Sequence, residues 1–264
     1  MKKFLAVGCV LAISSFSAMA ADMPFKTLPP PVPVFTWTGC YLGGNLGGIW
    51  RDTDNVRVGV VDGGSGAGAA VTAAAIPTAF DAGGVNWIVG GQTGCNYQIA
   101  SWVLGVETDF SSGFNGSATV TTNVPPFLPL TSSVSQDMRW IGTTRARAGW
   151  AWGNVLLYAT GGVAYANTSY AYALSGLASG STNAVAVSDS ATQLGWTAGG
   201  GLEWGFGAWS LKGEYLHYDL GIHTITAACS AVIGGCAGAA PTTFSAHFGE
   251  TGDIVRVGLN YRFY

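Results

Sequence analysis

IVRVGLNYRFY, residues 254–264, ends the chain, and the character of its side chains alternates along it. Apolar residues occupy every second position, and Arg256, Asn260 and Arg262 lie between them. A period of two is typical of a β-strand with one apolar and one polar face. A final strand of this kind, ending on aromatic residues, indicates a closed transmembrane barrel with aromatic girdles on its outer face. We expect the signal for membrane assembly to consist of Val257, Leu259, Tyr261, Phe263 and Tyr264.

The composition of the 264-residue chain agrees with a membrane barrel. Only 9% of residues are charged, the chain holds 40 glycines and 10 tryptophans, and mean hydropathy is positive at +0.33. A soluble globular protein rarely combines these values. Beyond the N-terminus the sequence lacks the roughly 18 consecutive apolar residues that a transmembrane helix needs. A hydrophobic chain without such helices can cross a membrane as a closed β-barrel, which leaves no backbone group unpaired in lipid.

The N-terminus has the pattern of a secretory signal. Lys2 and Lys3 precede an apolar run over residues 4–16, and Ala18-Met19-Ala20 supplies small residues at a cleavage site. This order predicts a signal peptide over residues 1–20. The alternative is a retained helical anchor, for which the apolar run is short.

A proline-rich segment follows the predicted signal. Residues 22–35 hold five of the ten prolines, which predicts an extended periplasmic linker over residues 21–35. Residues 36–264 then form the predicted outer-membrane barrel domain. Without Lys2 and Lys3 the mature chain has nine basic and fourteen acidic residues, so its net charge is 9 − 14 = −5. Such a chain is not expected to bind nucleic acid.

Segments with alternating side chains recur along the domain. They are residues 37–50, 85–98, 102–111, 134–150, 155–166, 193–204, 209–219 and 254–264. Short turns at residues 99–101, 151–154 and 205–208 alternate with long loops at residues 51–84, 112–133, 167–192 and 220–250. This rhythm predicts an all-β fold, an eight-stranded antiparallel up-and-down transmembrane β-barrel with short periplasmic turns and long extracellular loops.

Tryptophans gather near the ends of these segments. They are Trp37, Trp50, Trp87, Trp102, Trp150, Trp152, Trp204 and Trp209. Tryptophan is enriched where a protein surface meets the membrane interface. We therefore interpret them as girdle residues rather than as a cage for a cofactor, and we expect no cofactor.

The alternation also predicts which charged side chains point into the barrel. Eleven of the twenty-five charged residues fall on the inner face: Glu107, Asp109, Asp137, Arg139, Arg145, Arg147, Glu203, Lys212, Glu214, Arg256 and Arg262. An isolated charge at this depth is costly, so we expect these groups to pair across strands. Because eight strands enclose little more than side chains, one interpretation is a charge network that plugs and rigidifies the barrel. The alternative is a narrow ion-conducting passage.

The same charges could suggest catalysis. Glu107 and Asp109 with Arg145 and Arg147 resemble a catalytic cluster, but no matching nucleophile accompanies them. The sequence therefore does not predict an enzyme.

Four cysteines remain in the mature chain. Cys40 and Cys95 lie on the outer face near the turn ends of consecutive strands, which favours a disulfide between them. Cys229 and Cys236 would close a small loop by a second bridge. The alternative for each pair is two free thiols. His223 and His247 lie near the second pair, but their spacing fits no standard zinc pattern, and we expect no metal site.

Four stretches resemble a known family. Residues 35–44 (FTWTGCYLGG), 90–98 (GGQTGCNYQ), 212–219 (KGEYLHYD) and 255–263 (VRVGLNYRF) are similar to the small porin-like outer-membrane β-barrel proteins of alphaproteobacteria. The resemblance covers the mature chain and implies an OmpA-like eight-stranded barrel in the outer membrane of a Gram-negative cell. Members of the family commonly end on Phe, whereas here Tyr264 follows Phe263.

The resemblance does not fix one activity, since family members include porins, surface antigens and haemin-binding proteins. The leading hypothesis is a structural surface protein that supports envelope integrity. The alternatives are a narrow porin for small solutes or ions, and a haem- or host-binding protein that acts through its loops, with His223 and His247 as axial ligands. The expected partners are outer-membrane lipid and, through the C-terminal strand, the barrel-assembly machinery.

Overall fold

The computed structural model of the protein describes residues 35–52, 56–61, 78–80, 84–114, 118–124, 130–175, 185–229 and 242–263. The chain divides into two units between Pro33 and Val34, and the described residues all belong to the second unit. The predicted signal peptide and most of the predicted linker lie outside the described residues. Within the described part of the chain, no helix is long and apolar enough to cross a membrane.

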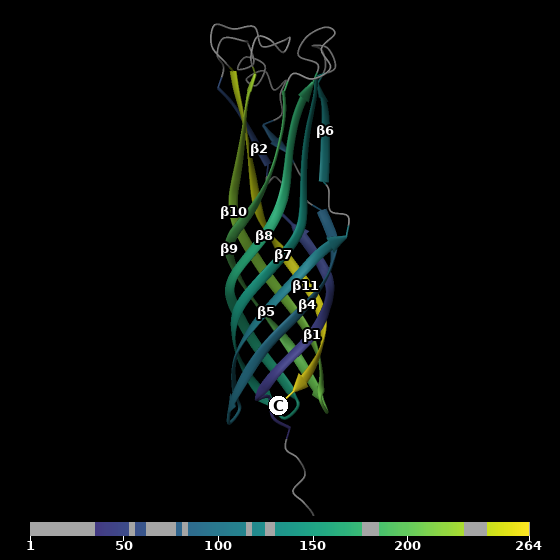
Figure 1. The fold of residues 1–264 in the computed structure, drawn as a ribbon, viewed down its shortest axis with the longest axis vertical. Coiled ribbons are helices and arrows are strands. Elements are labelled where there is room, and N and C mark those ends of the chain that lie inside the picture. The colour runs from purple at the N-terminus through teal and green to yellow at the C-terminus, as the bar shows by residue number, and fades with distance from the viewer. Residues whose placement is uncertain are drawn as a thin grey trace, which may run out of the picture. The chain divides into compact units, whose positions relative to one another are not determined.

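Eight antiparallel strands close into a barrel (Figure 1). They are β1 (Gly39–Arg51), β4 (Gly84–Ile99), β5 (Trp102–Phe114), β7 (Leu130–Trp152), β8 (Val155–Ser175), β9 (Val185–Phe206), β10 (Trp209–Cys229) and β11 (Thr242–Phe263). Each strand pairs with the next in the ring, and β11 pairs with β1 to close it. The predicted eight-stranded up-and-down barrel is confirmed.

The C-terminal strand closes the barrel with the predicted orientation of its side chains. In β11, Val257 lies opposite Leu46 of β1 and opposite Gly213 of β10. The side chains of Val255, Val257, Leu259, Tyr261 and Phe263 are about half exposed, whereas Arg256 and Arg262 are buried. The period of two that was read from the sequence therefore separates the outer and inner faces.

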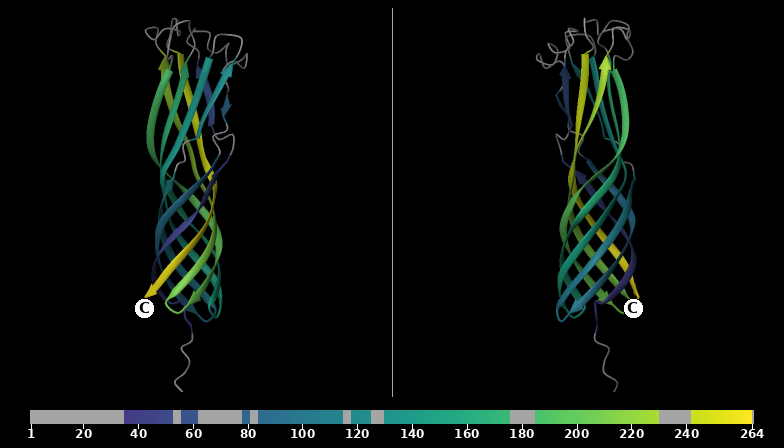
Figure 2. Two further views of the ribbon diagram at one scale, coloured as in Figure 1. Left: turned by 90° about the vertical axis from the view of Figure 1, so that its right-hand side faces the viewer. Right: turned by 60° about the vertical axis from the view of Figure 1, so that its left-hand side comes forward.

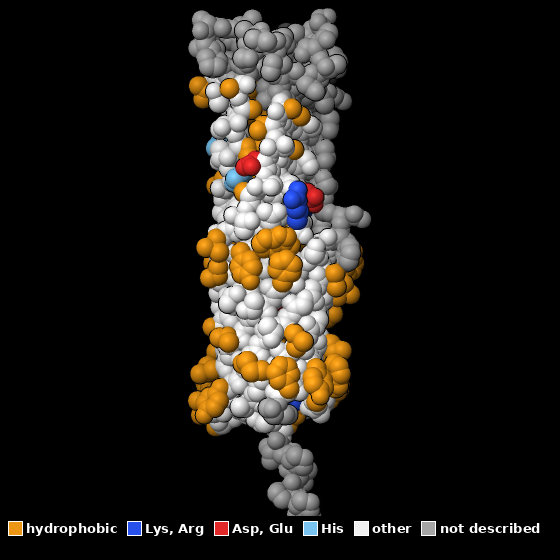
Figure 3. Space-filling view, in the orientation of Figure 1, with side chains coloured by type: hydrophobic (Ala, Val, Ile, Leu, Met, Phe, Trp, Pro, Cys, Tyr) orange, Lys and Arg blue, Asp and Glu red, His pale blue; other side chains and the backbone are white. Residues whose placement is uncertain are grey.

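Large apolar side chains form two rows on the outer surface, at two heights of the face seen in Figure 3. The row beside the turns, here called the turn-end girdle, comprises Trp102, Trp150, Trp204, Trp209 and Tyr261. The other row, the loop-end girdle, comprises Phe110, Trp140, Tyr165 and Trp196. Because aromatic girdles lie at the two membrane interfaces, they bound the lipid-facing zone. Trp37 is an exception to the predicted girdle, since only 1% of its surface is exposed and it lies inside the barrel.

Several strands continue beyond the loop-end girdle (Figures 1 and 2). Strands β7 to β11 contain 21 to 23 residues, whereas a membrane-crossing strand needs only about 9–11. The loops predicted over residues 167–192 and 220–250 are therefore partly strand. Their Ser, Thr, Ala and Tyr side chains carry a weaker alternation than the lipid-facing segments do, so sequence reasoning placed them in loops.

Among the described residues, the ring of strands is not continuous in this extension. Pairing between β9 and β10 ends at Trp196 and Asp219. Above that level β11 pairs with β2 (Val56–Val61), which in turn pairs with β3 (Ala79–Phe80), while β7 pairs with β6 (Ala118–Val124). The extension therefore consists of two sheets, β6-β7-β8-β9 and β10-β11-β2-β3.

The opposite end of the barrel has short turns, as predicted. Gly153 and Gly207 adopt positive φ angles of 60° and 61°, which glycine reaches without steric cost. Ala100 has a φ of 52° in the turn between β4 and β5. These tight turns fix the pairing of the strands that they join.

Candidate functional site: the barrel interior

The centre of the barrel holds a compact group of charged side chains. We call this group the charge layer: Glu107, Asp109, Arg145, Arg147, Glu203, Lys212, Glu214 and Arg256. All are at most 4% exposed, and they project inward from β5, β7, β9, β10 and β11. Four cations face four anions, so the layer is formally neutral.

Arg145 lies at the centre of the layer. Its guanidinium contacts Glu107 at 2.6 Å, Asp109 at 3.0 Å and Glu214 at 2.9 Å. Arg256 lies 2.8 Å from Asp109 and 2.6 Å from Glu214, so two guanidinium groups share two carboxylates. Such sharing satisfies the extra lone pairs of each carboxylate, which a buried ion pair requires to offset its desolvation.

The remaining cations complete the layer. Lys212 lies 2.6 Å from Glu107, and Arg147 lies 3.1 Å from Glu203. The guanidinium of Arg147 also stacks between the rings of Tyr41 and Tyr158, at 5.1 Å and 5.0 Å. Cation–π contacts of this kind add attraction where water is excluded.

Neutral side chains hold the acids in place. The Tyr41 hydroxyl donates to Glu107 at 2.5 Å, and the Tyr158 hydroxyl donates to Glu214 at 2.9 Å. The Thr143 hydroxyl donates to Asp109 at 2.5 Å. Each of these three acids therefore accepts hydrogen bonds from neutral donors as well as from cations, so the network is rigid rather than adaptable.

An apolar layer covers the charge layer on its loop side. It consists of Ile49, Ile88, Met138, Ile141, Ala164, Ala166, Leu216, Tyr218, Leu220 and Ile254. On β10 and β11, Leu216 and Ile254 are the next inward residues after Glu214 and Arg256 in the direction of the loops. A cavity of about 10 Å³ lies among Ile49, Ile88 and Ile141, which is about the space of one water molecule.

A second seal closes the turn end. Trp37 packs inside the barrel with Val103 and Leu156. The rings of Phe35 and Trp37 pack edge to face, with centroids 5.0 Å apart. Arg262 lies over the Phe35 ring at 4.1 Å. Its guanidinium donates to the carbonyl oxygens of Thr36 and Gly207 at 2.9 Å and 2.8 Å. Arg262 is therefore buried as predicted, but it fastens residues 35–37 into the barrel mouth instead of joining the charge layer.

Two of the eleven predicted interior charges point outward. A β-bulge lies between Met138 and Trp140 of β7. One extra residue reverses the alternation beyond it, because side chains change face with every residue. Met138 and Gln136 therefore point inward, and Asp137 and Arg139 lie on the outer face. The prediction for Asp137 and Arg139 was wrong for this reason.

Sequence reasoning missed a second buried polar group, beyond the apolar layer. Glu250 is fully buried and accepts hydrogen bonds from Gln136 at 2.5 Å and from Tyr170 at 3.0 Å. Arg51 donates to the carbonyl of Gln136 at 3.2 Å. Burial raises the pKa of the Glu250 carboxyl above its usual value. Glu250 lies six residues before Arg256, so both fall on the inward-facing positions of β11, and extending the alternation toward the loop would have found Glu250.

One of the two predicted cysteine bridges lies in the described structure. Cys40 and Cys95 are directly opposite each other on β1 and β4 and form a disulfide. The side chain of Cys229 and the whole of Cys236 lie outside the described residues, so the second bridge stays a prediction. Tyr264 also lies outside them.

The two histidines proposed as haem ligands do not face each other. His247 is exposed on β11 and contacts Thr224 at 2.8 Å. His223 stacks on Tyr170 with ring centroids 4.6 Å apart and contacts Asp189 at 3.1 Å. His247 lies one residue from the inward-facing Phe248, and His223 shares the parity of the buried Ile225. The two imidazoles therefore lie on opposite faces of one sheet and cannot bracket a single haem.

Comparison with known proteins adds the family. Residues 9–263 match the model of the outer membrane protein beta-barrel domain. The chain is 31% identical to a 31 kDa outer-membrane immunogenic protein of Brucella melitensis, over 99% of this chain and 100% of that one. It is 27% identical to a 25 kDa outer-membrane immunogenic protein of Brucella canis, over 77% and 76% of the two chains.

The chain is also similar to solved structures of outer-membrane proteins. The outer membrane protein OprG of Pseudomonas aeruginosa is similar with a TM-score of 0.45 and 12% identity, over 86% of this chain and 97% of that one. Neisserial surface protein A is similar with a TM-score of 0.35 and 9% identity, over 86% and 98%.

Proposed function

The chain belongs to the outer-membrane β-barrel family, and from this premise we propose that it is a non-enzymatic structural surface protein whose interior is closed to solutes. In this role the girdled part of the barrel anchors the protein in the outer membrane. The strand extension and the loops beyond it are displayed on the cell surface. The charge layer then serves to stabilise the barrel rather than to conduct.

The stacking of layers inside the barrel carries this proposal. An ion entering from the turn end would first meet the packed ring of Trp37, which Arg262 holds in place. It would then meet a neutral charge layer in which every charged side chain is already paired. Beyond that lies the apolar layer around Leu216 and Ile254, where an ion would lose its hydration without compensation. A conducting filter instead needs groups that replace the water of the ion along a continuous path.

The relatives support the surface role. The matched proteins of Brucella melitensis and Brucella canis are named immunogenic outer-membrane proteins. Exposure of the strand extension and its loops would explain why such a protein meets antibodies. The haem-binding alternative loses support, because His223 and His247 lie on opposite sheet faces.

Solute flux into proteoliposomes tests the proposal. Liposomes containing the folded mature protein should swell in isotonic solutions of small sugars and amino acids no faster than protein-free liposomes. Liposomes containing a general porin serve as the positive control. Swelling by the unaltered protein at a rate that falls with solute size would instead establish the narrow porin.

A further inference from the structure

The β7 bulge places two charged side chains on the outer surface at a particular height. Without the bulge, Asp137 and Arg139 would lie an even number of residues from Arg145 in an unbroken alternation, and they would point into the barrel as Arg145 does. Bulges commonly re-aim side chains in this way. The bulge lies next to Trp140 of the loop-end girdle, so the two charges emerge directly beyond the lipid-facing zone. In Figure 3, charged side chains stand just beyond the row of hydrophobic ones.

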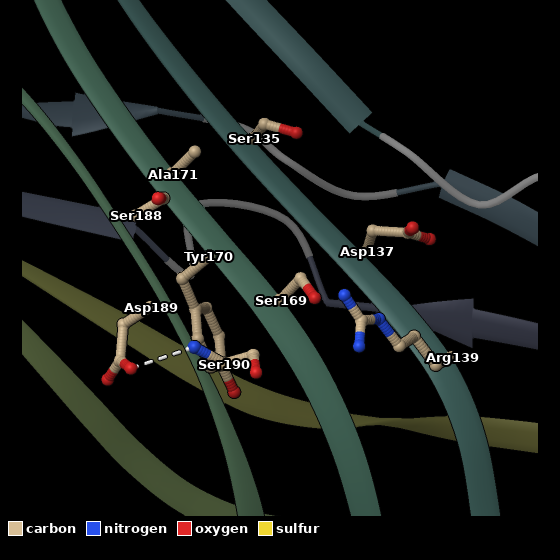
Figure 4. Close-up of a pocket in the computed structure, with 9 residues that line it drawn as sticks. All are labelled: Ser135, Asp137, Arg139, Ser169, Tyr170, Ala171, Ser188, Asp189 and Ser190. Carbon is tan, nitrogen blue, oxygen red and sulfur yellow. Dashed lines mark hydrogen bonds between the residues drawn. The ribbon is translucent and has the colours of Figure 1, made fainter.

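A polar hollow lies at this height on the outer face of β7, β8 and β9. It has a volume of about 540 Å³, which is within the usual range of ligand sites of roughly 300–1,000 Å³. Figure 4 shows its lining, which consists of Ser135, Asp137, Arg139, Ser169, Tyr170, Ala171, Ser188, Asp189 and Ser190. Hydroxyl groups from three strands and charges of both signs therefore surround one space.

Two groups in this lining have unused hydrogen-bonding capacity. The hydroxyl of Ser169 is buried and has no hydrogen-bond partner in the described part of the protein. Arg139 is exposed, and no described carboxylate lies within ion-pair distance of its guanidinium. Figure 4 shows the Ser169 hydroxyl directed toward Arg139. A buried polar atom without a partner calls for a ligand or water at this point.

We propose that this hollow binds the phosphorylated sugar headgroup of a glycolipid in the outer leaflet. The Arg139 guanidinium binds the phosphate, since its planar donors match phosphate oxygens. Sugar hydroxyls donate to the Asp137 carboxylate and exchange hydrogen bonds with Ser169 and Ser190. A bare anion fits less well, because the Asp137 carboxylate would repel it, whereas a phosphorylated sugar uses both Asp137 and Arg139.

The girdle next to the hollow supports a lipid as the source of this headgroup. Phe110 and Trp140 have ring centroids 5.2 Å apart, and Tyr165 continues the row at 6.3 Å from Trp140. Aromatic girdles lie at headgroup level, so acyl chains of a lipid bound in the hollow would run down over these rings. The site therefore places a polar pocket for the headgroup next to an apolar surface on which the acyl chains can lie.

Lipid titration tests the site directly. The folded mature protein is placed in phosphatidylcholine nanodiscs, bisphosphorylated lipid A is added in steps, and bound lipid is counted by native mass spectrometry. Arg139→Gln should weaken binding by about tenfold or more, the loss expected for a charge-assisted contact. Arg57→Gln alters another exposed arginine, on β2, and should leave the affinity unchanged. Heat-modifiable electrophoretic mobility confirms that each variant remains folded.

Three further arms identify the ligand chemistry. Dephosphorylated lipid A should bind about as weakly to the unaltered protein as bisphosphorylated lipid A binds to Arg139→Gln. Millimolar inorganic phosphate should not displace the bound lipid, whereas the deacylated phosphorylated disaccharide should compete. Equal binding by Arg139→Gln and the unaltered protein, equal binding of dephosphorylated lipid, or displacement by inorganic phosphate would each overturn the proposal.

Discussion

Replacing Arg145 by methionine should destabilise the barrel more than any surface change. Arg145 contacts Glu107, Asp109 and Glu214 within 3.0 Å, and its side chain is fully buried. Without it, the charge layer keeps four anions but only three cations. Removing one partner from a buried charge network typically costs about 3–5 kcal/mol, because the remaining charges stay desolvated. We expect a loss in this range in the free energy of unfolding.

Urea titration in phospholipid vesicles measures that loss. Folded and unfolded fractions are read from heat-modifiable mobility and from tryptophan fluorescence, in both folding and unfolding directions. Arg57→Gln is the matched control, since Arg57 is exposed on β2, and its effect should stay within about 0.5 kcal/mol. The double variant Arg145→Met with Glu214→Gln restores equal numbers of cations and anions in the layer and should recover part of the stability.

The size of the change decides between two accounts of the interior. If Arg145→Met lowers the free energy of unfolding by less than about 1 kcal/mol, the loss is no larger than that of an ion pair screened by solvent at the surface. Such a result would mean that water reaches Arg145, and it would refute a sealed charge layer.

Three further predictions follow from other parts of the chain. Burial raises the pKa of Glu250, so the folded state binds the proton more tightly than the unfolded state, and stability falls as pH rises from about 4.3 through the folded pKa. Because the ionised carboxylate destabilises the fold at pH 7, Glu250→Gln should slow amide exchange in the β10–β11 extension at that pH. Equal exchange in both proteins would contradict this. Breaking the Cys40–Cys95 disulfide, which spans 55 residues, should lower the free energy of unfolding by at most about 4 kcal/mol while the barrel still forms, as Cys40→Ser with Cys95→Ser would show in urea. Deleting residues 261–264 removes the pairing of Tyr261 with Leu42 and Trp209 and the contacts of Arg262, so membrane assembly should fail; a heat-modifiable barrel recovered from the outer membrane would oppose this.

Strong alternation made the barrel predictable from sequence. Lipid on one side and a packed interior on the other impose opposite chemistry on successive residues, so Val257 and Arg256 reveal their faces without any structure. The same rule placed nine of the eleven expected charges inside the barrel. It also brought Cys40 and Cys95 to one face of neighbouring strands, where they form a disulfide.

The rule failed where its physical basis weakens. A bulge shifts parity by one residue, and nothing in the sequence around Met138 marks that shift, so Asp137 and Arg139 were assigned to the wrong face. Beyond the loop-end girdle the outer face meets water, which removes the lipid signal and hid the strand that carries Glu250. Trp37 cannot be recognised from the sequence as an interior residue, because the sequence does not show that the chain folds into the barrel mouth before β1 begins.

Single-channel recording in planar bilayers tests the sealed interior most directly. The purified, folded protein at high salt should give no steps above the bilayer baseline at either polarity, while a general porin in the same bilayers should give them. Steady steps from the unaltered protein that disappear in Arg145→Ala would contradict the account, because they would place an ion path through the charge layer.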